Sequence, residues 1–226
     1  MATYFRRLIW VFFLTILMAT GLQAGPSNSA VEPILKSVET KYSSTSFQAD
    51  FIQESTLAAL EMTETASGRA WFSHPQKMKW RYLSPEAHEI ITNGQWIWIF
   101  RPQENQVMKG DAKSFFAGGA GGAFLTDMGS LRKNYTIELD KQSAHWAELV
   151  LTPRSSSKKG SPLQQELLNI RIGVHLPDPV IQEVTTTNIH GDTTRFKFKN
   201  IQFKPLSPKQ FEFEIPPGVD LIRMDE

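Results

Sequence analysis

Residues 72–85 have the sequence FSHPQKMKWRYLSP, and in their centre basic side chains alternate strictly with large apolar ones. Successive side chains of a β-strand point to opposite faces, so Met78, Trp80 and Tyr82 would share one face and only cations would occupy the other. The alternation therefore predicts a strand with one apolar face. It leaves open whether that face packs in an ordinary core or lines a space that another molecule fills.

The same period of two recurs along most of the chain. RFKFK at 195–199 and FEFEI at 211–215 repeat the alternation, and Asn93-Gly94 precedes an apolar run in the way typical of a hairpin. A slip of the pattern between Phe198 and Ile201 predicts a bulge near Asn200. One-sided strands at short spacing indicate an antiparallel sheet with one solvated face. Strands are predicted near 47–52, 68–73, 77–83, 91–100, 134–140, 147–153, 167–176, 179–189, 193–203 and 209–215.

Few segments break this period. Residues 30–43 carry an apolar stripe at helical spacing and predict one amphipathic helix. Residues 115–133, FFAGGAGGAFLTDMGSLRK, contain two Gly pairs, Gly118-Gly119 and Gly121-Gly122, and fit either a flexible linker or a mobile flap over an apolar surface. Residues 155–162, SSSKKGSP, predict a solvated loop.

The N-terminal residues predict export. Arg6-Arg7, a short apolar run and the small residues up to Ala24 are typical of a cleaved signal peptide at 1–24, with an uncleaved anchor as the alternative. Loss of Arg6 and Arg7 would change the formal charge from +1 to −1. Residues 25–226 would then form one nearly neutral domain with no bias towards nucleic acid or anionic membranes. The absence of cysteine excludes disulfides and thiolate chemistry, and suits a bacterial envelope protein.

No motif for catalysis or metal binding is present in the sequence. The five histidines lack the close spacing of a metal motif, and neither HExxH nor GxSxG occurs. GGAGGAF lacks the Lys-Ser/Thr ending of a phosphate-binding loop. We therefore expect no enzyme, no cofactor and no metal site, although residues distant in sequence could still converge in space.

The unusual feature of the chain is its supply of large apolar side chains, with six Trp and fifteen Phe. A one-faced twisted sheet must close on itself, meet a second sheet or be covered by helices. Because only one long helix and one Gly-hinged segment are available as cover, the sheet should enclose an apolar space. We expect Trp98 there, although Ile97 and Ile99 compete for the inward face. The full set of candidate cavity residues is Phe47, Phe51, Trp71, Met78, Trp80, Trp98, Phe124 and Leu125.

Four segments, in order and spacing, resemble the LolA family of periplasmic carriers of outer-membrane lipoproteins. They are SFQADFIQ at 46–53, GRAWFSHPQKMKWRY at 68–82, IITNGQWIWIFRPQENQV at 90–107 and QFEFEIPPGVDLI at 210–222. The resemblance implies a mainly β fold: a curved, incomplete antiparallel β-barrel, or half-barrel, with lid helices over a cavity for acyl chains.

The resemblance also implies partners and a lid latch. Acylated lipoproteins would arrive from an inner-membrane ABC-type release complex and leave to an outer-membrane receptor, with the carrier acting as a periplasmic monomer. In the family an Arg before the Pro of this motif latches the lid by hydrogen bonds, but this chain has His74 there. Imidazole offers fewer donors than guanidinium, so the latch should be weaker, different or moved elsewhere.

Three alternative functions are considered, in decreasing order of support. Related half-barrels occur in stress-signalling proteins, so a periplasmic ligand-sensing module is one alternative, although such a sensor would carry a further interaction domain. A carrier of another amphiphile, such as a glycolipid or polyketide precursor, is the second. A hydrolase is the last, because nothing positive supports it.

Overall fold

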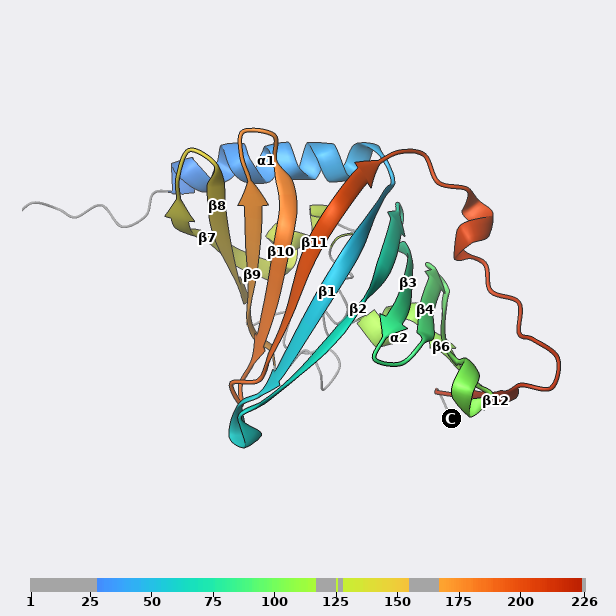
Figure 1. The fold of residues 1–226 in the computed structure, drawn as a ribbon. Helices are drawn as coiled ribbons and strands as arrows, with labels where there is room; N and C mark the ends of the chain where they lie inside the picture. Colours follow the sequence, from blue (N-terminus) through green and yellow to red (C-terminus); the bar gives the residue numbers. More distant parts are fainter. Residues whose placement is uncertain (1–27, 117–124, 126–127, 155–166, 225–226) are drawn as a thin grey trace, which may run out of the picture.

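The computed structural model describes residues 28–116, 125, 128–154 and 167–224, and these form one open, curled sheet of twelve strands (Figure 1). The strand order is β12-β6-β5-β4-β3-β2-β1-β11-β10-β9-β8-β7. Every neighbouring pair is antiparallel except β12 and β6, which run parallel. The strands are β1 (Phe47–Leu57), β2 (Met62–Ser73), β3 (Lys77–Ser84), β4 (His88–Asn93), β5 (Trp96–Arg101), β6 (Gln106–Asp111), β7 (Tyr135–Gln142), β8 (Trp146–Pro153), β9 (Leu167–His175), β10 (Val180–Asn188), β11 (Thr193–Phe203) and β12 (Asp220–Arg223). The predicted half-barrel is confirmed.

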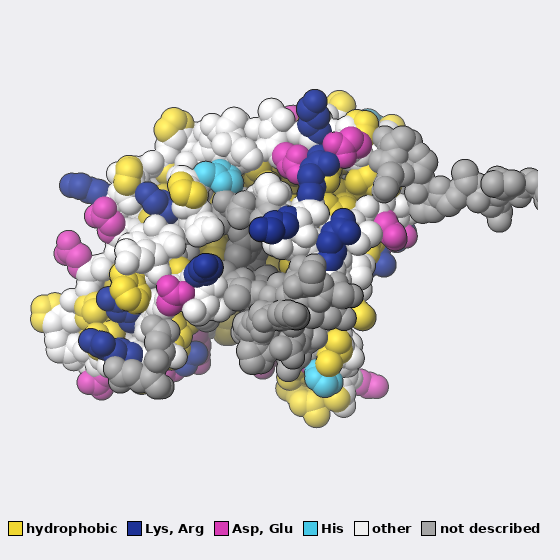
Figure 2. Space-filling view, turned by 180° about the vertical axis from the view of Figure 1, so that it is seen from behind, with side chains coloured by type: hydrophobic (Ala, Val, Ile, Leu, Met, Phe, Trp, Pro, Cys, Tyr) yellow, Lys and Arg dark blue, Asp and Glu magenta, His cyan; other side chains and the backbone are white. Residues whose placement is uncertain are grey.

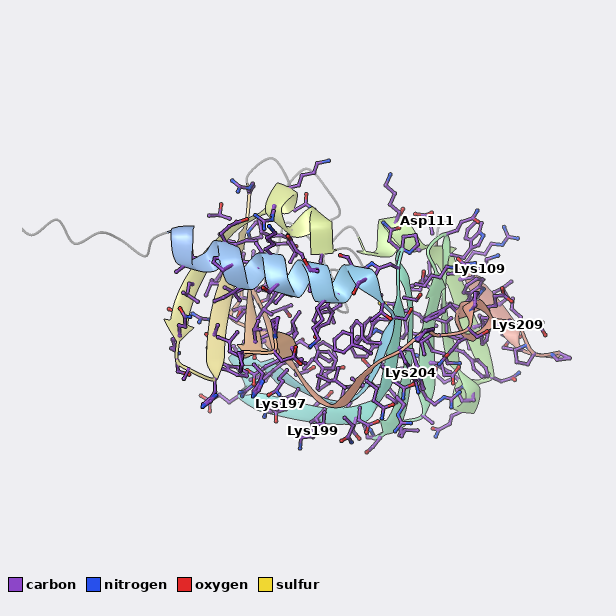
Figure 3. All side chains as sticks on the ribbon, turned by 90° about the horizontal axis from the view of Figure 1, so that it is seen from above. Lys109, Asp111, Lys197, Lys199, Lys204 and Lys209 are labelled. Atoms are coloured by element: carbon purple, nitrogen blue, oxygen red, sulfur yellow. The ribbon has the colours of Figure 1, made fainter. Side chains whose placement is uncertain are left out.

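Helices occupy the hollow side and the ends of this sheet. The long helix α1 (Asn28–Ser44) crosses the open side of the curve, as seen from above in Figure 3. The remaining helices are short: α2 (Ala112–Phe116), α3 (Leu131–Asn134) and the 3₁₀ helices η1 (Ala58–Leu60), η2 (Pro102–Glu104), η4 (Met128–Ser130) and η6 (Pro208–Phe211). Helix α1 contacts η4 and β7, and α3 contacts the same two elements. Within the described ranges, the lid is thus built from α1, η4 and α3 and meets the sheet at β7.

Local sequence signals explain the turns and bends. Asn93 accepts hydrogen bonds from the backbone N–H groups of Gln95 and Trp96, and Gly94 adopts a φ of 94°, which closes the β4–β5 hairpin. The predicted bulge is confirmed: the β1–β11 register shifts between Gln48 and Asp50, opposite Asn200, whose φ is 52°. A bulge of this kind increases the local twist of β1 and β11.

The C-terminal prediction was wrong. Residues 209–215 do not form a strand, because η6 ends at Phe211 and the chain then runs without regular structure to β12. Alternating phenylalanines and glutamates satisfy a strand pattern, but the neighbouring prolines at 205, 208, 216 and 217 remove backbone donors that a sheet ladder needs. Residues 204–219, called here the C-terminal strap, form an extended arm at the β4–β6 side of the molecule (Figure 1).

Several predicted features lie outside the described residues. These are the signal peptide at 1–24, the solvated loop at 155–162, Phe124 and both Gly pairs of the 115–133 segment.

Candidate functional site: an aromatic trough under a helical lid

The face of the sheet that lies beneath α1, called here the inner face, carries a continuous aromatic cluster. Phe47 stacks on Phe72 with ring centroids 4.5 Å apart, and the ring of Trp80 lies 4.9 Å from Phe51 and 5.0 Å from Phe196. These residues come from β1, β2, β3 and β11, which are neighbours in the sheet. Figure 3 shows aromatic side chains between the sheet and α1, while Lys197 and Lys199 point away on the other side. The curl of the sheet thus makes a trough with aromatic walls.

The lid over this trough is apolar on its lower side. The apolar stripe of α1 is buried, as are three residues of the 115–133 segment. The stripe residues are Val31, Ile34, Leu35, Val38 and Tyr42, and the other three are Leu125, Met128 and Leu131. Tyr42 also accepts a hydrogen bond from the backbone N–H of Ile181 at 2.8 Å, and burial raises the pKa of its hydroxyl well above the ordinary value. The lid therefore rests on the trough mainly through side chains that water does not contact.

A charged clasp joins the two parts of the lid. Arg132 of α3 donates hydrogen bonds to Glu39 at 2.8 Å and to Glu32 at 2.7 Å, both on α1. The pKa of Arg132 is raised by its hydrogen bonds to Glu39 and Glu32, and Arg132 in turn holds the pKa of Glu32 below its ordinary value. The clasp is exposed to solvent, so it can open without moving a buried charge.

Beyond the aromatic cluster the trough opens into a cavity of about 900 Å³ beside Tyr82. The Tyr82 hydroxyl donates to Gln53 at 2.7 Å, the Tyr82 ring stacks on His88 at 4.1 Å, and burial raises the pKa of Tyr82 to about 12. The lining is mixed in polarity and comes from β1, β2, β3, β4 and the β5–β6 connection; besides Tyr82, it includes Gln53, Ser55, Glu64, Ala66, His88 and Arg101. Volumes of this size are typical of small-molecule sites, which span about 300–1,000 Å³.

The buried Trp80 indole N–H has no hydrogen-bond partner among the residues that the structure describes. Trp80 is only 2% exposed and is surrounded by rings, so its donor is withheld from water. Buried polar groups are nearly always paired, and an unpaired one costs about 1–3 kcal/mol. The trough therefore holds one polar group that a carbonyl oxygen of a bound molecule would satisfy.

The structure brings five of the predicted cavity residues together and separates two. Phe47, Phe51, Met78, Trp80 and Leu125 all belong to one buried cluster under the lid. Met78 and Trp80 are packed rather than open, at 1% and 2% exposure, and the described cavity lies further along the face.

The placement of Trp71 and Trp98 at the cavity was wrong. Trp71 pairs with Lys79, and Trp98 pairs with Ile91 one strand further on, so both lie on the outer face, opposite Met78. In β5 the inward positions belong to Ile97 and Ile99, which alternate with Trp98. In an apolar run such as WIWIF both sets of alternating side chains are apolar. The sequence therefore did not decide which set faces inward.

Trp98 instead joins a second, smaller apolar cluster with Ile91 and Val107 on the outer face. Phe213 of the C-terminal strap covers it, with its ring 6.2 Å from that of Trp98 and 5.5 Å from that of Phe100. Lys109 of β6 lies over the Trp96 ring at 4.4 Å. The strap thus covers the outer face at β4–β6, as α1 covers the inner face.

The predicted latch residue His74 lies in the β2–β3 turn, partly buried, and among the described residues its ring makes no hydrogen bond. Arg132 was not identified from the sequence as a residue that holds the lid, although the spacing of two glutamates could have indicated it. Glu32 and Glu39 are seven residues apart on the predicted helix and so share one edge, where a cation from the 115–133 segment would meet both.

No described helix is long and apolar enough to cross a membrane. Within the described ranges no group of three or more His, Asp or Glu side chains is placed to hold a metal ion.

An open, curled and mainly antiparallel sheet with an aromatic trough under a helical lid defines the class of lidded half-barrels. Residues 42–214 match the family model described as "Outer membrane lipoprotein carrier protein LolA", so the chain belongs to the LolA family.

Individual relatives agree with this assignment. The outer-membrane lipoprotein carrier protein of Albidiferax ferrireducens is 28% identical over 94% of this chain and 99% of its own length. The protein of the same name from Chromobacterium violaceum is 27% identical over 92% and 94%. An uncharacterized conserved protein from Thermus thermophilus shares the fold with a TM-score of 0.55 at 14% identity, covering 86% of this chain and 99% of that one.

Proposed function

We propose that this protein is a periplasmic carrier that binds the acyl chains of lipoproteins in its inner trough and releases them to an acceptor. The observation that carries the proposal is the aromatic cluster around Trp80, which lies on a curled sheet beneath a lid whose two described parts are joined by the exposed clasp of Arg132. The chain's membership of the LolA family and the names of its relatives support the same role.

The energetics of such a carrier require apolar surface and no catalyst. Each buried CH2 group contributes about 0.8 kcal/mol, so keeping a chain of about 16 carbons in water costs on the order of 12 kcal/mol. Aromatic and methionine walls adapt to flexible chains, and they lower this cost without fixing one ligand shape. The unpaired Trp80 N–H would donate to an ester or amide carbonyl of the acylated residue.

Loading requires the aromatic cluster to separate from the lid, because Met78 and Trp80 are packed in this structure. Release of the Arg132 clasp would let α1 and α3 move apart and expose both. The proposed route brings lipoproteins from an inner-membrane ABC-type complex, after export by the predicted signal peptide, and passes them to an outer-membrane receptor.

The test compares two variants that place the same side chain on opposite faces of β3. Met78→Gln nearly conserves shape but puts an amide in the trough, whereas Lys77→Gln alters the outer side of the same strand. We expect Met78→Gln to weaken binding of a fluorescent fatty-acyl probe by about tenfold, because the amide loses its water when the chain enters. Lys77→Gln should bind the probe like the wild type.

Thermal unfolding of both variants separates binding from stability. Probe affinity that is unchanged in a folded Met78→Gln protein, or reduced equally in both variants, would overturn the proposed site. Mass spectrometry of acylated molecules that co-purify from the native periplasm would identify the cargo.

A further inference from the structure

The sheet ends in an exposed apolar tip where two turns meet. One turn is η1, between β1 and β2, and the other connects β10 to β11. In Figure 2 hydrophobic side chains gather at this lower tip of the molecule. We call the following four residues the apolar lip: Leu57, Leu60, Met62 and Ile189, which are 45%, 63%, 51% and 58% exposed. Clustered exposed apolar side chains of this kind mark interaction sites.

Hydrogen bonds hold the two turns together. The carboxylate of Asp192 accepts from the backbone N–H of Ala58 at 2.9 Å and from the side-chain amide of Asn188 at 3.0 Å. Asn188 also accepts from the backbone N–H of His190 at 2.9 Å. The apolar lip is therefore a fixed surface built from two hairpins rather than two independent loops.

The apolar lip continues the inner trough. Leu57 pairs with Met62 across β1 and β2, and the next inward pair along these strands, Ser55 and Glu64, lines the cavity beside Tyr82. Because side chains two residues apart share a face, Leu57 and Met62 extend the inner face past the cavity to the tip. A molecule that leaves the aromatic cluster along the trough would reach the apolar lip last.

The charges around the apolar lip favour a neutral surface as its partner. Neither turn contains Lys or Arg between residues 57–64 or 189–193, and Glu61, Glu64 and Asp192 give this end a negative charge. Anionic lipids would therefore be repelled, whereas an uncharged interface would accept the apolar side chains. The lip also protrudes, which suits insertion between lipid headgroups.

We propose that the apolar lip inserts into the interface of neutral lipid bilayers and so places the open end of the trough against the membrane surface. The inference rests on the proposed function, because it assigns the place where acyl chains enter and leave. The protein would then contact lipid directly, in addition to any protein partners.

The experiment measures co-flotation of the whole protein with phosphatidylcholine vesicles. The test variant is Leu60→Ser/Ile189→Ser. Its matched control, Leu221→Ser/Ile222→Ser, removes one leucine and one isoleucine, each 43% exposed, from the edge strand β12, away from the lip at the ends of the central strands. We expect the lip variant to bind vesicles roughly tenfold more weakly than the wild type, and the control to bind equally well.

Three results would overturn the inference: no flotation of the wild type, equal loss in both double variants, or tighter binding when phosphatidylglycerol is added. Flotation only with native membranes and not with pure lipid would assign the lip to a protein partner instead. Binding of the fatty-acyl probe in solution separates the two proposals. A wild type that floats but does not bind the probe would refute the carrier function alone, and one that binds the probe but does not float would refute the lip alone.

Discussion

The inner and outer faces of this sheet are made by alternate residues of the same strands, yet they are stabilised in different ways. The inner face buries aromatic rings under α1. The outer face carries rows of ion pairs, including Arg195 with Glu183 at 2.9 Å and Lys197 with Glu54 at 2.9 Å, all partly exposed. Exposed ion pairs contribute about 0–1 kcal/mol each, whereas a buried aromatic side chain contributes several times that. The stability of the fold should therefore reside on the inner face.

The largest expected change in the free energy of unfolding is at Gly68 on the inner face, and Gly173 on the outer face is its comparison. A Cβ at Gly68 would lie 2.0 Å from the backbone oxygen of Arg81, whereas one at Gly173 would lie 2.2 Å from the ring of Trp146. Gly68→Ala must push β2 from β3 and should cost about 3 kcal/mol or more in the free energy of unfolding. Gly173→Ala should cost about 1 kcal/mol, because the partly exposed indole can move. Urea denaturation measures both, and a larger loss for Gly173→Ala would reverse the comparison.

Two phenylalanines test the faces directly. Phe72 is 1% exposed and stacks in the trough, whereas Phe100 on the outer face is only partly buried beneath the strap. Phe72→Ala should destabilise the protein by about 3–5 kcal/mol, and Phe100→Ala by about half as much. The measurement is again the free energy of unfolding. Equal losses would show that the strap packs its face as well as α1 does.

An acid titration tests the best buried ion pair of the outer face. Burial alone would raise the pKa of Glu89, but hydrogen bonds from Lys79 at 2.9 Å and Arg81 at 2.5 Å outweigh it, so the pKa lies below its ordinary value of 4.5. The folded state thus favours the carboxylate, and this stabilisation is present above pH 4.5 and is lost as pH falls through the lowered pKa. Glu89→Gln should cost about 1–2 kcal/mol at pH 7 and much less at about pH 3. A difference that does not change with pH would contradict this account.

The smallest effect on stability is expected at the clasp. Arg132→Gln should lower the free energy of unfolding by only about 0.5 kcal/mol, because the pairs with Glu32 and Glu39 are exposed. Amide hydrogen exchange in α1 and in residues 128–134 should nevertheless become faster, because the lid opens more often.

Arg69→Gln, which breaks the outer-face pair with Asp50 at 2.7 Å, is the matched control. It should leave exchange in the lid unchanged. Equal exchange in the Arg132→Gln protein and the wild type would show that the clasp does not hold the lid closed.

Much of the trough could be predicted from strands whose two faces differ in polarity. KMKWRY and RFKFK each have one charged side, so burial of the wrong side would cost several kcal/mol, and the inward residues follow from the sequence alone. WIWIF has no charged side, and there the prediction for Trp98 failed. The His74 latch was inferred from a motif position, but the ring makes no hydrogen bond to a described residue, and Arg132 provides the contact from a segment without periodicity.

The sequence by itself determined most of the strands, though not β6 or β12, together with the apolar stripe of α1, the bulge at Asn200 and the aromatic chemistry of the inner face. Each of these depends on residues close together in the chain. The tertiary structure decided which face Trp98 occupies, that the C-terminal strap rather than a thirteenth strand covers that face, and that Arg132 meets Glu32 and Glu39. It also placed η1 beside the β10–β11 turn to form the apolar lip. These features join residues far apart in the chain, and the curl of the sheet, which no single segment encodes, sets the distances between them.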